Sequence, residues 1–303
     1  MIAPPPARRS CLSVPAASPR KLEMAPSFGA DEIVLDLEDS VVPAMKPDAL
    51  SAALRVLRGW PATPDLPGTT AVSVRVNPPR TRWCHLELAA LAASGETAGS
   101  VVLPKVESAA DLAFAERLLD GAEAAAGRRI PLRIQALIET APGLSHVGEI
   151  AGSSERLESL IIGYADLGTS LGRSSTGGRS LDLWLAAQES VLAAARTHGL
   201  QAIDGPFLGT VDNEQFRLAS ARARDLGFDG KWAIHPSQVP ALNALFSPSD
   251  EDISRAHAVL AALDRGKSDA RTGAVELDGE MVDEATRRSA LRLLAQAATA
   301  ERR

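Results

Sequence analysis

The chain has 303 residues, of which 45% are hydrophobic and 23% charged, and its formal net charge is −6. This is the balance of an ordinary globular protein, long enough for one α/β barrel or two smaller domains. The negative charge argues against nucleic acid as the main partner, and the lack of an 18-residue apolar run argues against a membrane span. Two cysteines without ligand or disulfide spacing, and an amino-terminal segment without an apolar core, predict a soluble cytoplasmic protein.

Strand-like and helix-like segments alternate through most of the chain. Short apolar, β-branched runs predict strands at residues 11–14, 32–37, 71–76, 100–104, 132–138, 159–164, 201–203 and 231–234. Helical patterns lie between them, at residues 19–28, 48–57, 109–126, 181–197 and 213–226. A doubly wound sheet also alternates, but the Gly-x-Gly-x-x-Gly turn after its first strand is absent. We therefore expect an α/β fold, a (β/α)8 TIM barrel over residues 1–246.

The remaining residues, 247–303, have a different pattern. A capping box at Ser249 to Asp252 begins a predicted helix over 250–265, and a second helix is expected over 284–299. Between them, Asp278-Gly279 is a favoured two-residue hairpin turn. Such a helix–hairpin–helix segment is too small to bury a core of its own. We expect it to be a lid or oligomerisation extension that packs on the barrel or on a neighbouring subunit.

Two carboxylates stand at the ends of neighbouring predicted strands. Glu139 follows Leu137-Ile138, and Asp166 follows Ile161-Ile162 by a few residues. An acidic side chain at the end of a buried strand needs a cation or hydrogen bonds to compensate its charge. The pair therefore predicts one oxygen-ligand site for a hard divalent ion such as Mg²⁺. For each residue taken alone, the alternative is a helix N-cap.

Polar residues follow the other predicted strands as well. They are Glu38, Asp39, Arg75, Asn77, Lys105, Asp204 and His235. The carboxyl ends of barrel strands share a common mouth, where barrel enzymes place their chemistry. A solvated loop is polar too, so the prediction of a site depends on the repetition over eight strands.

Eight segments in this order resemble the citrate lyase beta-subunit-like (CitE-like) branch of the HpcH/HpaI aldolase family, to which malyl-CoA lyases are related. The matching stretches are Arg9-Ser-Cys-Leu with Pro15, Val34-Leu-Asp-Leu-Glu-Asp39-Ser-Val, Arg75-Val-Asn77, Leu103-Pro-Lys-Val-Glu107, Ile138-Glu-Thr-Ala-Pro-Gly143, Gly163-Tyr-Ala-Asp166-Leu, Gln201-Ala-Ile-Asp204 and Gly230-Lys-Trp-Ala-Ile-His-Pro-Ser-Gln238. The resemblance implies a (β/α)8 barrel that binds Mg²⁺, with Mn²⁺ as an alternative, through Glu139 and Asp166.

The resemblance also implies roles for residues around the metal. Glu38 and Asp39 match an acidic pair that holds metal-bound waters, and Asn77 is expected behind the metal ligands or beside the substrate. Arg75 matches an arginine that contacts the carbonyl of the 2-oxo acid or thioester, where its fork of donors faces developing negative charge. The alternative for Arg75 is a salt bridge to Glu38 or Asp39.

Asp283 matches an aspartate of the family's C-terminal lid, which reaches the active site of an adjacent subunit. The resemblance therefore implies a homotrimer or hexamer in which Asp283 is the acid or base that serves the acyl-CoA enolate. The alternative is a hairpin-end or helix-cap residue.

CoA recognition is predicted for basic residues near the first strands and after the last one. A diphosphate and a 3′-phosphate favour lysine, arginine and backbone donors, so Arg9, Arg20 and Lys46 are candidates. Each is otherwise a solvated surface charge. His235 is expected to be structural or to contact the cofactor, and a role as a base is the alternative.

The predicted activity is Mg²⁺-dependent carbon–carbon lyase chemistry. By the resemblance, the protein cleaves or forms a malyl-, citramalyl- or citryl-CoA type thioester by a retro-aldol reaction, giving a 2-oxo acid and an acyl-CoA. One alternative is a synthase-thioesterase, which condenses the two and then hydrolyses the thioester. Another is the beta subunit of a citrate lyase complex that acts on an acyl-carrier protein.

Overall fold

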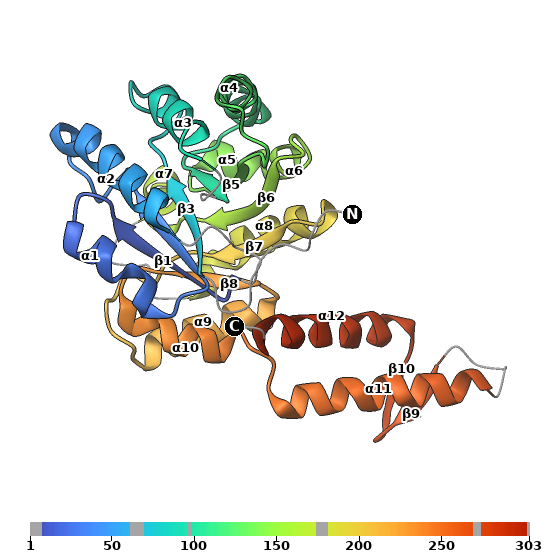
Figure 1. The fold of residues 1–303 in the computed structure, drawn as a ribbon. Coiled ribbons are helices and arrows are strands. Elements are labelled where there is room, and N and C mark those ends of the chain that lie inside the picture. Colours follow the sequence, from blue (N-terminus) through green and yellow to red (C-terminus); the bar gives the residue numbers. More distant parts are fainter. Residues whose placement is uncertain (1–7, 61–69, 96–98, 174–180, 269–273, 302–303) are drawn as a thin grey trace. The chain divides into compact units, whose positions relative to one another are not determined.

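The computed structural model describes residues 8–60, 70–95, 99–173, 181–268 and 274–301 (Figure 1). The chain forms two compact units, residues 1–244 and 245–303, which we call the barrel unit and the C-terminal unit. None of the described helices is long and apolar enough to cross a membrane.

The barrel unit contains a closed barrel of eight parallel strands in chain order, which confirms the predicted fold. The strands are β1 (Ser10–Pro15), β2 (Glu32–Asp36), β3 (Ala71–Arg75), β4 (Ser100–Leu103), β5 (Arg133–Ile138), β6 (Leu157–Ile162), β7 (Gln201–Asp204) and β8 (Gly230–Ala233). Strand β8 pairs with β1 and closes the circle, with Trp232 opposite Cys11. The predicted strands agree with these bounds to within two residues.

Helices cover the outside of the barrel (Figure 1). They are α1 (Pro19–Met24), α2 (Lys46–Gly59), α3 (Cys84–Ala92), α4 (Ala109–Ala126), α5 (Ala141–Ser145), α6 (Val147–Ala151), α7 (Tyr164–Ser170), α8 (Leu185–Thr197), α9 (Glu214–Leu226) and α10 (Val239–Leu245). Short 3-10 turns occur at η1 (Ala25–Phe28), η2 (Pro43–Met45), η3 (Leu181–Trp184) and η4 (Pro236–Gln238).

The barrel interior is layered, because every second residue of a strand points inward. At the amino-terminal end, which we call the floor, the layer is polar. Gln135 Nε2 donates to Glu32 Oε1 at 2.7 Å and to Ser100 Oγ at 2.8 Å, and Arg8 Nε donates to Glu32 Oε2 at 3.0 Å. These groups are buried and satisfy one another, which keeps the cost of burying them low.

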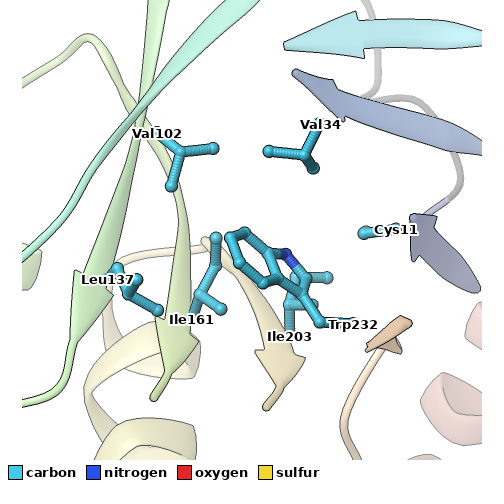
Figure 2. Packing of buried hydrophobic residues seen from close by; sticks show 7 residues of the cluster. All are labelled: Cys11, Val34, Val102, Leu137, Ile161, Ile203 and Trp232. Carbon is cyan, nitrogen blue, oxygen red and sulfur yellow. The ribbon is translucent and has the colours of Figure 1, made fainter. Parts of the chain in front are cut away.

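An apolar layer lies above the floor (Figure 2). It consists of the buried side chains of Cys11, Val34, Val102, Leu137, Ile161, Ile203 and Trp232. The next inward-facing positions toward the carboxyl ends of the strands include Asp36 and Arg75, which pair in register on β2 and β3. The mouth of the barrel is therefore charged, and the apolar layer is its base.

The C-terminal unit consists of α11 (Asp250–Ser268), a hairpin of β9 (Val275–Leu277) and β10 (Glu280–Val282), and α12 (Glu284–Glu301). Its helices pack on each other around the buried side chains of Ala256, Val259, Leu263, Val282 and Ala290. The expectation that this segment buries no core of its own is therefore wrong, because the hairpin covers the seam of the helix pair. Its role as a lid stays a prediction.

Candidate active site

Glu139 and Asp166 extend from neighbouring strand ends. Glu139 directly follows β5 and is buried, whereas Asp166 lies in the first turn of α7, just after β6, with a side chain that is 39% exposed. Both carboxylates face the ammonium group of Lys105. Its Nζ is 2.9 Å from Asp166 Oδ2 and 4.0 Å from Glu139 Oε1. The structure thus brings the two predicted metal ligands to one place, the mouth of the barrel.

Lys105 is central to this cluster, although the sequence analysis gave it no role. It follows β4 and has a left-handed backbone conformation, with φ of 52°, which is uncommon for a residue other than glycine. The backbone N–H of Lys105 donates to Glu139 Oε1 at 3.0 Å, and this hydrogen bond holds the conformation. Its ammonium also donates to Glu38 Oε1 at 2.6 Å.

Arg75, the last residue of β3, is held rigidly. Its Nε and Nη2 donate to the two carboxylate oxygens of Asp36 at 2.8 and 2.7 Å, and its Nη1 lies 2.9 Å from Glu38 Oε2. Asp39 is a more distant partner, at 3.5 Å. The guanidinium also lies over the ring of Trp232. The alternative of a salt bridge to Glu38 or Asp39 is therefore present, together with a stronger pair to Asp36 that the sequence analysis missed.

The cluster is rich in negative charge. Its carboxylates are Asp36, Glu38, Asp39, Glu139 and Asp166, and its cations are Arg75 and Lys105. Burial, reinforced by the charge of Glu38, raises the pKa of Glu139 to about 8. Burial also raises the pKa of Glu38. Burial would raise the pKa of Asp36 too, but the charge and hydrogen bonds of Arg75 outweigh it, so the pKa of Asp36 is lowered. This excess of carboxylates favours an additional cation.

The donor set fits a hard cation such as Mg²⁺. Glu38 Oε2 is buried and makes no hydrogen bond of acceptable geometry, although Arg75 Nη1 is near it. Across the described residues, no three acidic, histidine or cysteine side chains converge tightly enough to form a complete protein cage. Mg²⁺ does not need one, because it commonly takes one or two carboxylates and keeps several waters. Glu139 and Asp166 are the two candidates for that role, and their assignment stays a prediction.

Asn77 supports the site from behind and does not line it. It is buried, its Nδ2 donates to Glu87 Oε1 at 2.6 Å and to the Leu37 carbonyl at 3.1 Å, and its N–H donates to Glu87 Oε2 at 2.7 Å. Of the two places expected for Asn77, behind the metal ligands or beside the substrate, these bonds favour the first. Glu87, a residue of α3 with no signal in the sequence pattern, fixes it.

Two of the predicted CoA contacts, Arg9 and Lys46, are engaged by other groups of the protein. Arg9 precedes β1, so it lies at the floor of the barrel, where its Nε and Nη2 donate to Asp31 at 2.8 Å. Lys46 is buried at the start of α2, and its ammonium donates to the carbonyls of Leu37 at 2.9 Å and Glu38 at 3.0 Å. An ammonium that is already buried and bonded is a poor partner for a phosphate. Lys46 instead fixes the loop that carries Glu38.

The other two candidates lie at the mouth end. Arg20 is exposed on α1, which follows β1. His235 is exposed after β8, and its Nδ1 accepts a hydrogen bond from Ser237 N at 3.2 Å, so the imidazole caps η4, in line with the structural alternative. Asp204, expected at the mouth, pairs with Lys231, and both point outward because their strand neighbours Ile203 and Trp232 belong to the interior layer.

Asp283 lies in the C-terminal unit and caps α12. Its Oδ1 accepts from Ala285 N at 2.9 Å and from Thr286 N at 3.1 Å. These bonds lower the pKa of Asp283, with Thr286 the largest contributor. The helix-cap alternative is therefore present, and a role in proton transfer stays a prediction.

The family profile of HpcH/HpaI aldolase/citrate lyase matches residues 9–236. The chain belongs to this family. It is 36% identical to an L-malyl-CoA/β-methylmalyl-CoA lyase of Rhodobacter capsulatus over 98% of both chains, and 36% identical to a (3S)-malyl-CoA thioesterase of Cereibacter sphaeroides over 91% of this chain and 89% of that one. Among solved structures, it is similar to CitE of Mycobacterium tuberculosis in complex with magnesium, acetoacetate and coenzyme A. The TM-score is 0.75 at 32% identity, covering 96% of this chain and 98% of that one.

Proposed function

We propose that the protein is a Mg²⁺-dependent carbon–carbon lyase that interconverts a malyl-CoA type 3-hydroxyacyl-CoA thioester with a 2-oxo acid and an acyl-CoA. The observation that carries the proposal is the convergence of Glu139 and Asp166 on Lys105 at the mouth of a family barrel. Glu38 pairs with both Lys105 and Arg75, so the guanidinium belongs to the same cluster. Two relatives support the proposal. One is the L-malyl-CoA/β-methylmalyl-CoA lyase, which is similar over 98% of both chains, and the other is the solved CitE structure with magnesium and coenzyme A.

The residues present suit retro-aldol cleavage. Mg²⁺, held by Glu139 and Asp166, would supply Lewis acidity toward an oxygen of the oxo acid. Arg75 offers N–H donors to the oxygen that becomes the carbonyl, and Asp36 keeps the guanidinium in one orientation. As the hydroxyl loses its proton, the electrons of the broken carbon–carbon bond pass to the acyl-CoA α-carbon. The resulting enolate then takes up a proton.

Asp283 is our candidate for that proton transfer. Its cap hydrogen bonds use Oδ1, which leaves Oδ2 for the role. Because the resemblance gives this aspartate to the site of an adjacent subunit, we propose a cytoplasmic homotrimer or hexamer. Multi-angle light scattering tests this, and an active monomer in solution would contradict it.

Turnover measurements test which thioester is the substrate and in which direction the reaction runs. Purified protein with Mg²⁺ is given malyl-, β-methylmalyl-, citramalyl- and citryl-CoA, and 2-oxo acid and free CoA are measured separately. We expect 2-oxo acid and acyl-CoA in equal amounts, with malyl-type thioesters the best substrates. The absence of 2-oxo acid from every thioester would contradict the proposal.

A second candidate is favoured by the thioesterase relative. If the protein is a synthase-thioesterase, free CoA appears during condensation of an acyl-CoA with glyoxylate or pyruvate. Activity restricted to carrier-loaded substrate would instead indicate the beta subunit of a citrate lyase complex.

Arg20 is our remaining candidate for the CoA phosphates, and His235 is our candidate for a contact near them.

A further inference from the structure

The ammonium of Lys105 stands among the carboxylates that would hold the metal. We infer that Lys105 is an internal cation that occupies the Mg²⁺ position in the metal-free protein, and that it must leave Asp166 before Mg²⁺ binds. This inference depends on the proposed metal site. It assigns a role to a residue that is neither a metal ligand nor, so far, part of the chemistry.

The distances make the two cations mutually exclusive. Mg²⁺ coordinates oxygen at about 2.1 Å, so an ion shared by Glu139 and Asp166 has to lie within that distance of both carboxylates. Lys105 Nζ is already 2.9 Å from Asp166 Oδ2 and 4.0 Å from Glu139 Oε1. A divalent ion placed there would be within a few ångströms of a positive charge, and the two would repel strongly.

The side chain of Lys105 is free to change its conformation, whereas that of Arg75, the other cation of the cluster, is fixed. Arg75 is buried and tied by two hydrogen bonds to Asp36. The side chain of Lys105 is 32% exposed, and its flexible four-carbon stem carries the ammonium. Its backbone is fixed independently of the ammonium, by the N–H bond to Glu139 Oε1.

The ammonium also has a second partner that it can keep. Glu38 Oε1 lies 2.6 Å from Nζ, and Glu38 is not one of the two proposed ligands. When Asp166 turns to a metal ion, Lys105 can remain paired with Glu38. In the metal-free protein the same ammonium screens the repulsion between the carboxylates, so the site stays assembled.

Replacement of Lys105 by methionine tests the inference, since it removes the charge and keeps an unbranched stem. Mg²⁺ binding to metal-stripped protein, without substrate, is measured by isothermal titration calorimetry, and the melting temperature is measured with and without Mg²⁺. We expect Lys105→Met to bind Mg²⁺ at least about tenfold more tightly than the wild type, or about 1.4 kcal/mol. It should melt lower without Mg²⁺ and gain more on its addition.

Lys21→Met is the matched control, because it removes one positive charge from an exposed position on α1. It should change the Mg²⁺ dissociation constant by less than about twofold, as expected for a screened surface charge. Lys105→Gln serves as a second neutral variant if Lys105→Met does not fold. Mg²⁺ affinity of the Lys105 variants equal to or weaker than that of the control overturns the inference.

The failure of the inference is distinguishable from the failure of the metal site. If the wild type binds Mg²⁺ and Glu139→Gln does not, but Lys105→Met binds no more tightly, only the role of Lys105 is wrong. If neither the wild type nor Lys105→Met binds Mg²⁺, both proposals fall. A crystal structure with Mg²⁺ gives a direct readout: Nζ should be more than about 4 Å from Asp166 Oδ2, beyond ion-pair distance, and still on Glu38.

Discussion

Asp36 binds Arg75 through both carboxylate oxygens, with Nε to Oδ1 at 2.8 Å and Nη2 to Oδ2 at 2.7 Å. Asp36 also accepts hydrogen bonds from the backbone N–H groups of Glu38 at 2.9 Å and Ser40 at 3.2 Å. One buried carboxylate therefore orients the guanidinium and shapes the loop that carries Glu38.

Asp36→Asn should reduce both stability and turnover. Breaking a buried ion pair leaves Arg75 with less compensation, so we expect the free energy of unfolding to fall by about 3 kcal/mol. Loss of a residue that orients a site group should lower kcat by about 10- to 100-fold. Asp31→Asn is the control, since Asp31 binds Arg9 in the same two-bond geometry at the floor. It should destabilise the protein and leave the kcat of the folded fraction unchanged; an equal loss of kcat would refute the role of Asp36.

Glu139→Ala and Asp166→Ala should each abolish Mg²⁺-dependent turnover while the protein stays folded, because each removes one of only two proposed protein ligands. Removal of Mg²⁺ from the wild type with a chelator should give the same loss, and Mg²⁺ should restore the wild type alone. Turnover and circular dichroism are measured on the same samples. Wild-type activity in either variant would remove that residue from the metal assignment.

Gly163→Ala should act through Glu139. A Cβ on Gly163 would lie 2.6 Å from Glu139 Cβ and 2.7 Å from Glu139 Oε2, so the carboxylate has to shift. We expect a loss of Mg²⁺ affinity and of kcat of about 10-fold or more. Gly121→Ala, on α4 with nothing within 4 Å of its Cβ, is the matched glycine control and should stabilise the helix by up to about 1 kcal/mol. Unchanged Mg²⁺ binding in Gly163→Ala would show that the shift is harmless.

Lys46→Met separates a positioning role from CoA binding. Removing the ammonium leaves the carbonyls of Leu37 and Glu38 without these bonds, which should cost about 1–3 kcal/mol of stability and lower kcat. The dissociation constant of free CoA should not change. Arg20→Ala, at an exposed position, should instead raise KM for the thioester. Weakened CoA binding in Lys46→Met would revive the sequence interpretation.

The two thiols should be inert in the folded protein. Cys11 and Cys84 are both buried, and burial raises the pKa of Cys84 to about 12 and that of Cys11 well above its usual range. Since only the thiolate reacts, the native protein should not react with a thiol reagent at pH 8, and both cysteines should react after denaturation. Rapid reaction of a native thiol, identified with Cys84→Ser, would contradict the burial.

The barrel was predictable because its signals are local. A buried parallel strand needs a short β-branched run. Glu139 stands directly after one such run, and Asp166 follows another by a few residues. The direction of Arg9 could also have been predicted, since a residue before a barrel strand lies at the floor and cannot join the mouth. The expectation that Arg9 binds CoA came from the motif around it and overlooked its position before the strand.

Other parts of the site depend on contacts that no local pattern encodes. Asp36 belongs to a strand run, where an acidic residue gives no sign of a partner on the next strand. Lys105 was visible at a strand end, but no local pattern indicates its left-handed backbone. Its three carboxylate neighbours come from segments that follow three other strands. Lys46 resembles any basic residue at a helix start until two carbonyls are brought to it.

The seven apolar side chains between floor and mouth have a practical consequence for anyone who wishes to re-engineer this enzyme (Figure 2). They separate the ion pairs of the floor from the charged cluster at the mouth. We therefore expect substitutions in the Arg8–Glu32 network to change thermal stability more than turnover. We expect substitutions in the loops at the mouth to change turnover more than stability.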